Sequence, residues 1–184
     1  LSPWRQYFQM MTPGLLVASV LVLLLTTSSA SRTKWLWALG VALTGYFAEV
    51  IGVQTGVLFG EYSYDWVLGP QVLDVPLVIG INWLLLTYLM AHITRNWPIH
   101  WVLGAVLAAA MMVGLDILIE PVAIQYDMWH WEQALPPMQN YLGWFLVALP
   151  IQLVTHRLPF ALDSQWAKPL LAANLLFFIL LNIF

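Results

Sequence analysis

The chain has 184 residues and a formal net charge of −3; 61% of its residues are hydrophobic and 8% are charged. An ordinary soluble domain carries about 25% charged residues, so this composition argues against a soluble domain, a disordered chain and a nucleic-acid-binding protein. The absence of cysteine excludes disulfides, iron–sulfur clusters and a thiolate nucleophile.

Six stretches approach the roughly 20 apolar residues that a helix needs to cross a bilayer. They are residues 13–31, 35–53, 75–94, 99–121, 140–158 and 167–184. We therefore predict an all-α protein, a single integral membrane domain over residues 1–184 with about six transmembrane helices. Pro121 is expected to end the fourth helix, because the residue before a proline disfavours the α region, and Pro150 should kink the fifth.

The first stretch has an alternative interpretation. Leu15–Leu25 resembles the apolar core of a signal peptide, with Ser28 and Ala30 resembling a cleavage site. Arg5 alone is a weak basic region before such a core, so we favour a transmembrane helix. Residue 1 is not methionine, which leaves room for a further helix upstream.

The basic residues predict the orientation. Five of them, Arg32, Lys34, Arg95, Arg157 and Lys168, fall at the loops 32–34, 95–98 and 156–168. Only Arg5 falls on the opposite side, so the positive-inside bias places these three loops in the cytoplasm. The loops 54–74 and 122–139 contain no Lys or Arg and are expected outside. We expect a multi-pass protein of the cell (inner or plasma) membrane.

Three carboxyls lie within the predicted spans, near their outer ends. Glu49 is on the second helix, whereas Asp116 and Glu120 are four residues apart on the fourth and so share a face. A charge in the bilayer costs roughly 2.5–3.5 kcal/mol on insertion scales, so such groups are candidate functional residues. Small residues at three- and four-residue spacing, such as Gly45 and Gly52, predict that Glu49 points into the bundle.

Polar and aromatic side chains share this depth. Asn82 lies in the third helix, and Asn140 with Trp144 one turn deeper lies in the fifth. Trp83 is inside a span beside the polar layer, and the segment 129–131 (Trp-His-Trp) is a candidate lid over it. The other seven tryptophans are interpreted as an interfacial belt. The belt comprises Trp4, Trp35, Trp37, Trp66, Trp97, Trp101 and Trp166.

Buried acids of this kind predict proton chemistry. A carboxyl in an apolar pocket, or beside a second carboxylate, can stay protonated at neutral pH and act as a general acid. Asp116 and Glu120 are a candidate pair sharing one proton, and Glu49 is a candidate partner. A metal site is not predicted, because His130 is the nearest imidazole and no paired ligand motif occurs on these helices. Aromatic faces attract cations, so the pocket suits a carbocation formed from an apolar alkene.

Two blocks of sequence resemble a known family. The first begins at Glu49, continues through Thr-Gly-x-x-Phe-Gly-x-Tyr-x-Tyr at residues 55–64 and reaches Asn82-Trp83. The second contains Asp116-Ile-Leu-Ile-Glu120-Pro121, Trp129-His-Trp131 and Asn140-Tyr-Leu-Gly143-Trp144. Both resemble the CruF-type carotenoid 1',2'-hydratases and the related bacterioruberin-pathway hydratase. Loop residues 127–129 and 135–139 depart from the family's pattern, which leaves the substrate open.

The resemblance implies cofactor-independent addition of water to the terminal double bond of a lycopene-like end group, a hydro-lyase reaction. The carotenoid would be taken from the lipid bilayer. We hypothesise that Asp116 or Glu120 delivers the proton, and that Glu49 with Asn82 or Asn140 positions the water. The pocket would be lined by aromatic residues, namely Trp83, Trp129, Trp131 and Trp144. Tyr62 and Tyr64 either bond the acids or only anchor their loop.

Three other functions remain open at this stage. A carotenoid cyclase would use the same proton but capture the cation with an internal alkene. A pigment-binding membrane subunit would hold the carotenoid without turnover. A proton-coupled transporter is less favoured, because neither an internal repeat nor broken midplane helices are evident. The sequence does not give the oligomeric state.

Overall fold

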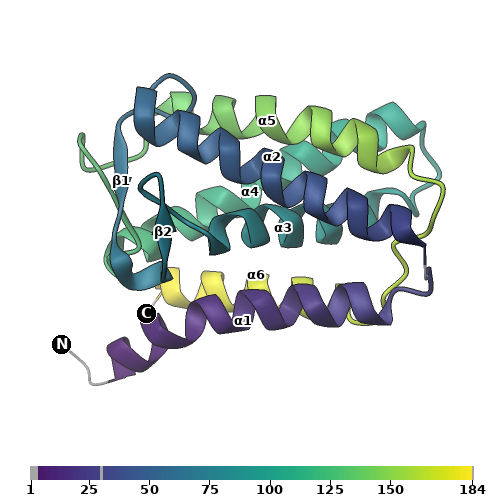
Figure 1. The fold of residues 1–184 in the computed structure, drawn as a ribbon, viewed down its shortest axis with the longest axis horizontal. Helices are drawn as coiled ribbons and strands as arrows, with labels where there is room; N and C mark the ends of the chain where they lie inside the picture. The colour runs from purple at the N-terminus through teal and green to yellow at the C-terminus, as the bar shows by residue number, and fades with distance from the viewer. Residues whose placement is uncertain (1–3, 30, 184) are drawn as a thin grey trace.

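The computed structural model describes residues 4–29 and 31–183, which contain six α-helices that pack side by side (Figure 1). The helices are α1 (Trp4–Thr26), α2 (Arg32–Thr55), α3 (Val78–Thr94), α4 (Trp101–Gln125), α5 (Met138–His156) and α6 (Ala167–Ile183). The prediction of an all-α membrane helix bundle is confirmed. Leu1 and Ala30, and the side chains of Trp4 and Arg5, on which some of the predictions rest, lie outside the described part.

Short extended segments occupy the connections at one end of the bundle. They are the strands β1 (Tyr62–Tyr64), β2 (Gln71–Val72), β3 (Val75–Pro76) and β4 (Trp129–Trp131), and a 3₁₀ turn, η1 (Trp66–Leu68), follows β1. Strand β1 pairs antiparallel with β4, and β2 pairs antiparallel with β3. We call this end, where both termini also lie (Figure 1), the strand end.

The expectation that Pro121 ends the fourth helix is wrong, because α4 continues through it to Gln125. A proline inside a helix removes a backbone donor, so the carbonyl four residues earlier, here that of Ile117, loses its helical partner. In membrane helices such carbonyls are satisfied by neighbouring helices. Here Asn182 of α6 donates to the neighbouring carbonyl in the same turn, that of Leu118, at 2.8 Å. Residue Glu120 therefore lies inside a continuous helix.

Helix lengths are consistent with a membrane protein. Among the described residues, three segments are long and apolar enough to cross a bilayer, namely Gln9–Thr26, Arg32–Thr55 and Trp101–Gln125. The apolar helices Val78–Thr94 and Ala167–Ile183 have 17 residues each, about 26 Å at 1.5 Å per residue. Large exposed apolar side chains on α6, such as Phe177 and Leu180, are suited to contact with lipid.

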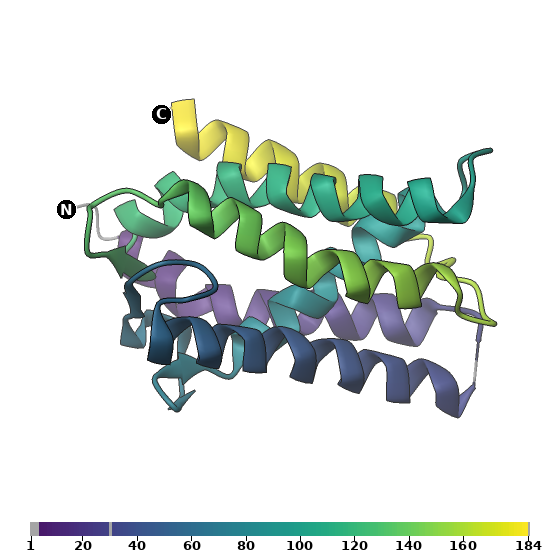
Figure 2. The ribbon, with the colours of Figure 1, turned by 90° about the horizontal axis from the view of Figure 1, so that it is seen from above.

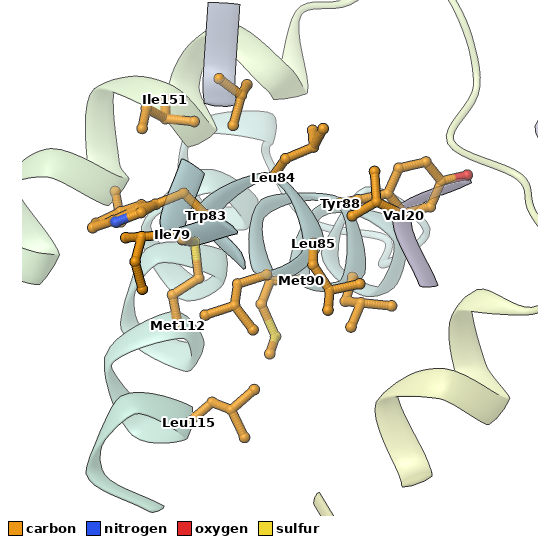
Figure 3. Close-up of a cluster of buried hydrophobic side chains, with 14 of the residues drawn as sticks. Val20, Ile79, Trp83, Leu84, Leu85, Tyr88, Met90, Met112, Leu115 and Ile151 are labelled. Atoms are coloured by element: carbon orange, nitrogen blue, oxygen red, sulfur yellow. The ribbon is translucent and has the colours of Figure 1, made fainter. Parts of the chain in front are cut away.

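Helix α3 forms the centre of the bundle. Fourteen of its 17 residues are buried, and it packs against the other five helices, crossing behind α5 in Figure 2. Figure 3 shows α3 side chains such as Trp83 and Leu85 in one buried cluster with Val20 of α1, Met112 of α4 and Ile151 of α5. A helix that is apolar all round is a buried helix, which explains the polar-poor sequence of this segment.

The opposite end, which we call the basic end, carries the connections predicted to be cytoplasmic. Lys34 is buried and its Nζ donates to backbone carbonyls at the end of α1, 2.8 and 3.4 Å away. Arg95 similarly donates to two carbonyls of the loop after α5. The assignment of Trp37 to an interfacial belt is wrong. Its side chain is 7% exposed and donates to Thr155 at 3.0 Å, because the α2 face that carries it turns toward α5.

Candidate functional site

Two glycines of α2 make room for the groups that surround its carboxyl. A Cβ at Gly45 would lie 2.2 Å from Cγ of Trp83, and one at Gly52 would lie 2.9 Å from the Tyr62 hydroxyl. Real side chains do not approach so closely, so these positions require glycine. Since Gly45, Glu49 and Gly52 are all buried, the predicted inward face of α2 is the observed one.

Glu49 accepts three hydrogen bonds from neutral side chains. Trp83 Nε1 donates to its Oε1 at 2.9 Å. The hydroxyls of Tyr62 and Tyr64 donate to its Oε2 at 2.5 and 2.9 Å. The tyrosines therefore bond the acid, which answers the question that the sequence left open. Burial, and then the Glu49 carboxylate, raise the pKa of both tyrosines above the ordinary value, which keeps them protonated as donors.

The two carboxyls of α4 share one amide. Asn140 Nδ2 of α5 lies 3.0 Å from Oδ2 of Asp116 and 3.3 Å from Oε1 of Glu120. The indole nitrogens of Trp129 and Trp131 both donate to Glu120 Oε2, at 3.1 and 2.9 Å. Glu120 thus accepts three hydrogen bonds. Within the described residues, Asp116 accepts one, from Asn140.

The strand pair β1–β4 delivers four of these donors. Tyr62 lies opposite Trp131 and Tyr64 lies opposite Trp129, and side chains two residues apart on a strand point to the same face. One strand therefore supplies both phenols to Glu49, and the other supplies both indoles to Glu120. His130, between the two indoles, takes the opposite face and lies 2.5 Å from Asp65. The segment 129–131, expected as a lid, covers Glu120 in this way.

A small cavity lies between the three carboxyls. It is lined by Glu49, Tyr62, Tyr64, Ile79, Asn82, Asp116, Ile119, Glu120, Trp129, Trp131, Asn140 and Trp144. We call it the acid cavity. The space inside it that a water-sized molecule can occupy is about 20 Å³, which is room for about one water. Within the described residues no group of three or more His, Cys, Asp or Glu side chains is placed to hold a metal.

Of the eleven site residues that the sequence predicts, all except Trp83 line the acid cavity. Trp83 is fully buried and stacks on Trp144, with ring centroids 4.1 Å apart and an angle of 12° between the planes. It therefore backs the wall formed by Trp144 and bonds Glu49 (Figure 3 shows its position beside Ile79). Sequence reasoning missed Ile79 and Ile119, whose helical spacing from Asn82, Asp116 and their neighbours was the available signal.

Comparison with known proteins identifies the family. The family described as "Carotenoid biosynthesis protein" matches residues 10–184. The chain belongs to this carotenoid biosynthesis family. A bisanhydrobacterioruberin hydratase of Haloarcula japonica is 31% identical over 127 residues, which cover 62% of this chain and 42% of the relative. The chain thus matches less than half the length of that relative. No solved structure matches this member of the carotenoid biosynthesis family.

Proposed function

We propose that this protein adds water to the terminal double bond of an acyclic, lycopene-like carotenoid end group, as a cofactor-independent hydro-lyase. The observation that carries the proposal is the acid cavity, where three buried carboxyls meet aromatic walls and every described hydrogen-bond donor to them is neutral. Such a site has excess negative charge and suits a cationic intermediate. The bisanhydrobacterioruberin hydratase of Haloarcula japonica, which is 31% identical over 127 residues, supports this reaction type.

Hydrogen bonding favours different roles for the three acids. A carboxylate is stabilised by donated hydrogen bonds, and Glu49 and Glu120 each accept three. These two are best suited to remain anionic. Asp116 accepts one such bond, from an amide that it shares. Asp116 is therefore the preferred proton donor, and Glu49, with Asn82 or Asn140, positions the water.

The proposed reaction conserves all atoms and electrons. The Asp116 carboxyl transfers its proton to the less substituted alkene carbon, and the alkene π electrons form the new C–H bond. The adjacent carbon becomes a tertiary cation, faced by the indoles of Trp144 and Trp131. A lone pair of water forms the C–O bond, and the oxonium returns one proton to the Asp116 carboxylate. The product is a tertiary alcohol.

The substrate and the orientation form part of the same proposal. A polyene is insoluble in water and would reach the cavity from the bilayer. A five-carbon end group is larger than the room for about one water, so the walls of the cavity have to separate on binding. We assign the basic end to the cytoplasm on the positive-inside rule and the strand end to the outside of the plasma membrane, in a multi-pass topology.

Expression in a lycopene-producing host grown in ¹⁸O-labelled water tests the reaction. The expected pigment carries one added water, with the label in its hydroxyl group. Asp116→Asn and Glu49→Gln should each abolish this product, whereas Asp163→Asn, at an exposed carboxyl of the basic end, should not. Wild-type rates in both site variants would refute the assignment. A product of unchanged mass would indicate a cyclase, and unaltered pigment that copurifies with the protein would indicate a binding subunit.

A further inference from the structure

A second hollow, which we call the polar groove, lies against the strand pair next to the acid cavity. Its lining includes Gln54, Glu61, Ser63, His130 and Glu132, and it offers about 530 Å³ to water-sized molecules. All five of these residues are exposed. The groove is therefore an open, hydrophilic space, in contrast to the small acid cavity, whose lining includes aromatic and apolar side chains.

Two side chains, Tyr62 and Trp131, line both the polar groove and the acid cavity. They are cross-strand partners in the β1–β4 pair, and their ring centroids are 4.9 Å apart. Each is also held on the cavity side, Tyr62 by its bond to Glu49 and Trp131 by its bond to Glu120. The two rings thus form the boundary between the groove and the cavity.

We propose that Tyr62 and Trp131 form the gate through which the water substrate passes from the polar groove into the acid cavity. This inference rests on the proposed hydration, which consumes one water per turnover while the polyene occupies the lipid side of the site. The cavity has room for about one water. A closed ring pair therefore limits how much water meets the cation, and a brief separation of the rings admits the next molecule.

The two strands supply matched controls for this gate. Tyr64 donates to the same Glu49 oxygen as Tyr62, and Trp129 donates to the same Glu120 oxygen as Trp131. Tyr64 and Trp129 line the acid cavity but not the polar groove. Replacing either member of a pair removes one hydrogen bond to the same carboxyl, but only the replacement of Tyr62 or Trp131 also opens the boundary between the groove and the cavity.

Cysteine labelling tests the gate without requiring turnover. Because the chain has no cysteine, Ile119→Cys introduces one thiol into the acid cavity, and the protein in lipid nanodiscs is treated with a small charged methanethiosulfonate. Adding Trp131→Ala should raise the labelling rate at least about tenfold, since access is governed by the opening equilibrium. Adding Trp129→Ala should change it less than about twofold by the same reasoning.

Tyr62→Ala against Tyr64→Ala repeats the comparison independently if a tryptophan variant does not fold. A Ser63→Cys reporter in the polar groove controls for reagent access and should react at the same rate in every background. The gate would be overturned if Trp131→Ala left the labelling rate of Ile119→Cys unchanged. It would also be overturned if the gate variant and its control variant raised the labelling rate equally. If the labelling rates follow the expected pattern but the protein forms no hydrated product, the result counts against the proposed function and not against the gate.

Discussion

Replacement of Gly45 by alanine is the sharpest perturbation of the candidate site that leaves its polar groups in place. The added Cβ would lie 2.2 Å from Cγ of Trp83, at least 1.2 Å short of the 3.4 Å at which ordinary contact begins. Trp83 has no room to retreat, because it is fully buried and stacked on Trp144. Overpacking of this kind costs about 1–3 kcal/mol, which corresponds to a fall in apparent Tm of roughly 2–12 °C for a chain of this size.

Gly40→Ala on the same helix is the matched control, because a Cβ there meets nothing within 4 Å. Alanine favours a helix over glycine by up to about 1 kcal/mol, so this variant should melt at or above the wild-type temperature. Thermal unfolding in detergent, followed by circular dichroism, measures both. Equal apparent Tm values for Gly45→Ala and Gly40→Ala would refute the expected clash with Trp83.

Three further outcomes are expected. Because the pKa of Tyr62 and of Tyr64 is raised in the folded protein, both residues stabilise the folded state. This contribution to the free energy of unfolding is complete below the tyrosine pKa of the unfolded chain, about 10, and is lost as the pH rises above it. Tyrosinate absorbance should show that Tyr62 and Tyr64 ionise only when the protein unfolds. In the double variant Tyr62→Phe, Tyr64→Phe, the number of tyrosines that ionise only on unfolding should fall by two. Ionisation of both residues near pH 10 in the folded protein would contradict this prediction. Trp83→Phe keeps most of the packing but removes a donor to a buried carboxylate, so the free energy of unfolding should fall by about 1–3 kcal/mol, whereas the exposed Trp166→Phe should change little. Asn140→Ala should slow hydration at least about tenfold, because it removes the donor shared by both carboxyls of α4, a loss of roughly 1.5–3 kcal/mol; an unchanged rate in a helical, folded variant would exclude that role.

Local periodicity explains which features could be predicted. The expected spans coincide with the six helices apart from their ends, because apolar length is a property of consecutive residues. The spacing of Asp116 and Glu120 placed them on one face for the same reason. The end of α4 was mispredicted, because a distant segment contacts α4 beside Pro121: Asn182 of α6 donates to the Leu118 carbonyl in the turn before the proline.

The amino-acid sequence by itself determined the class of protein, the helical segments and the common depth of the acids, since each depends on composition and short-range spacing. Only the tertiary structure decided which donors serve which carboxyl, because the strands β1 and β4 that carry them are three residues long and have 64 residues between them. No local pattern encodes that pairing. It arises when α2 and α4 pack around α3 and bring the two connections to the same end. There the phenols of β1 donate hydrogen bonds to Glu49 and the indoles of β4 donate hydrogen bonds to Glu120, without neutralising the charge of either carboxyl.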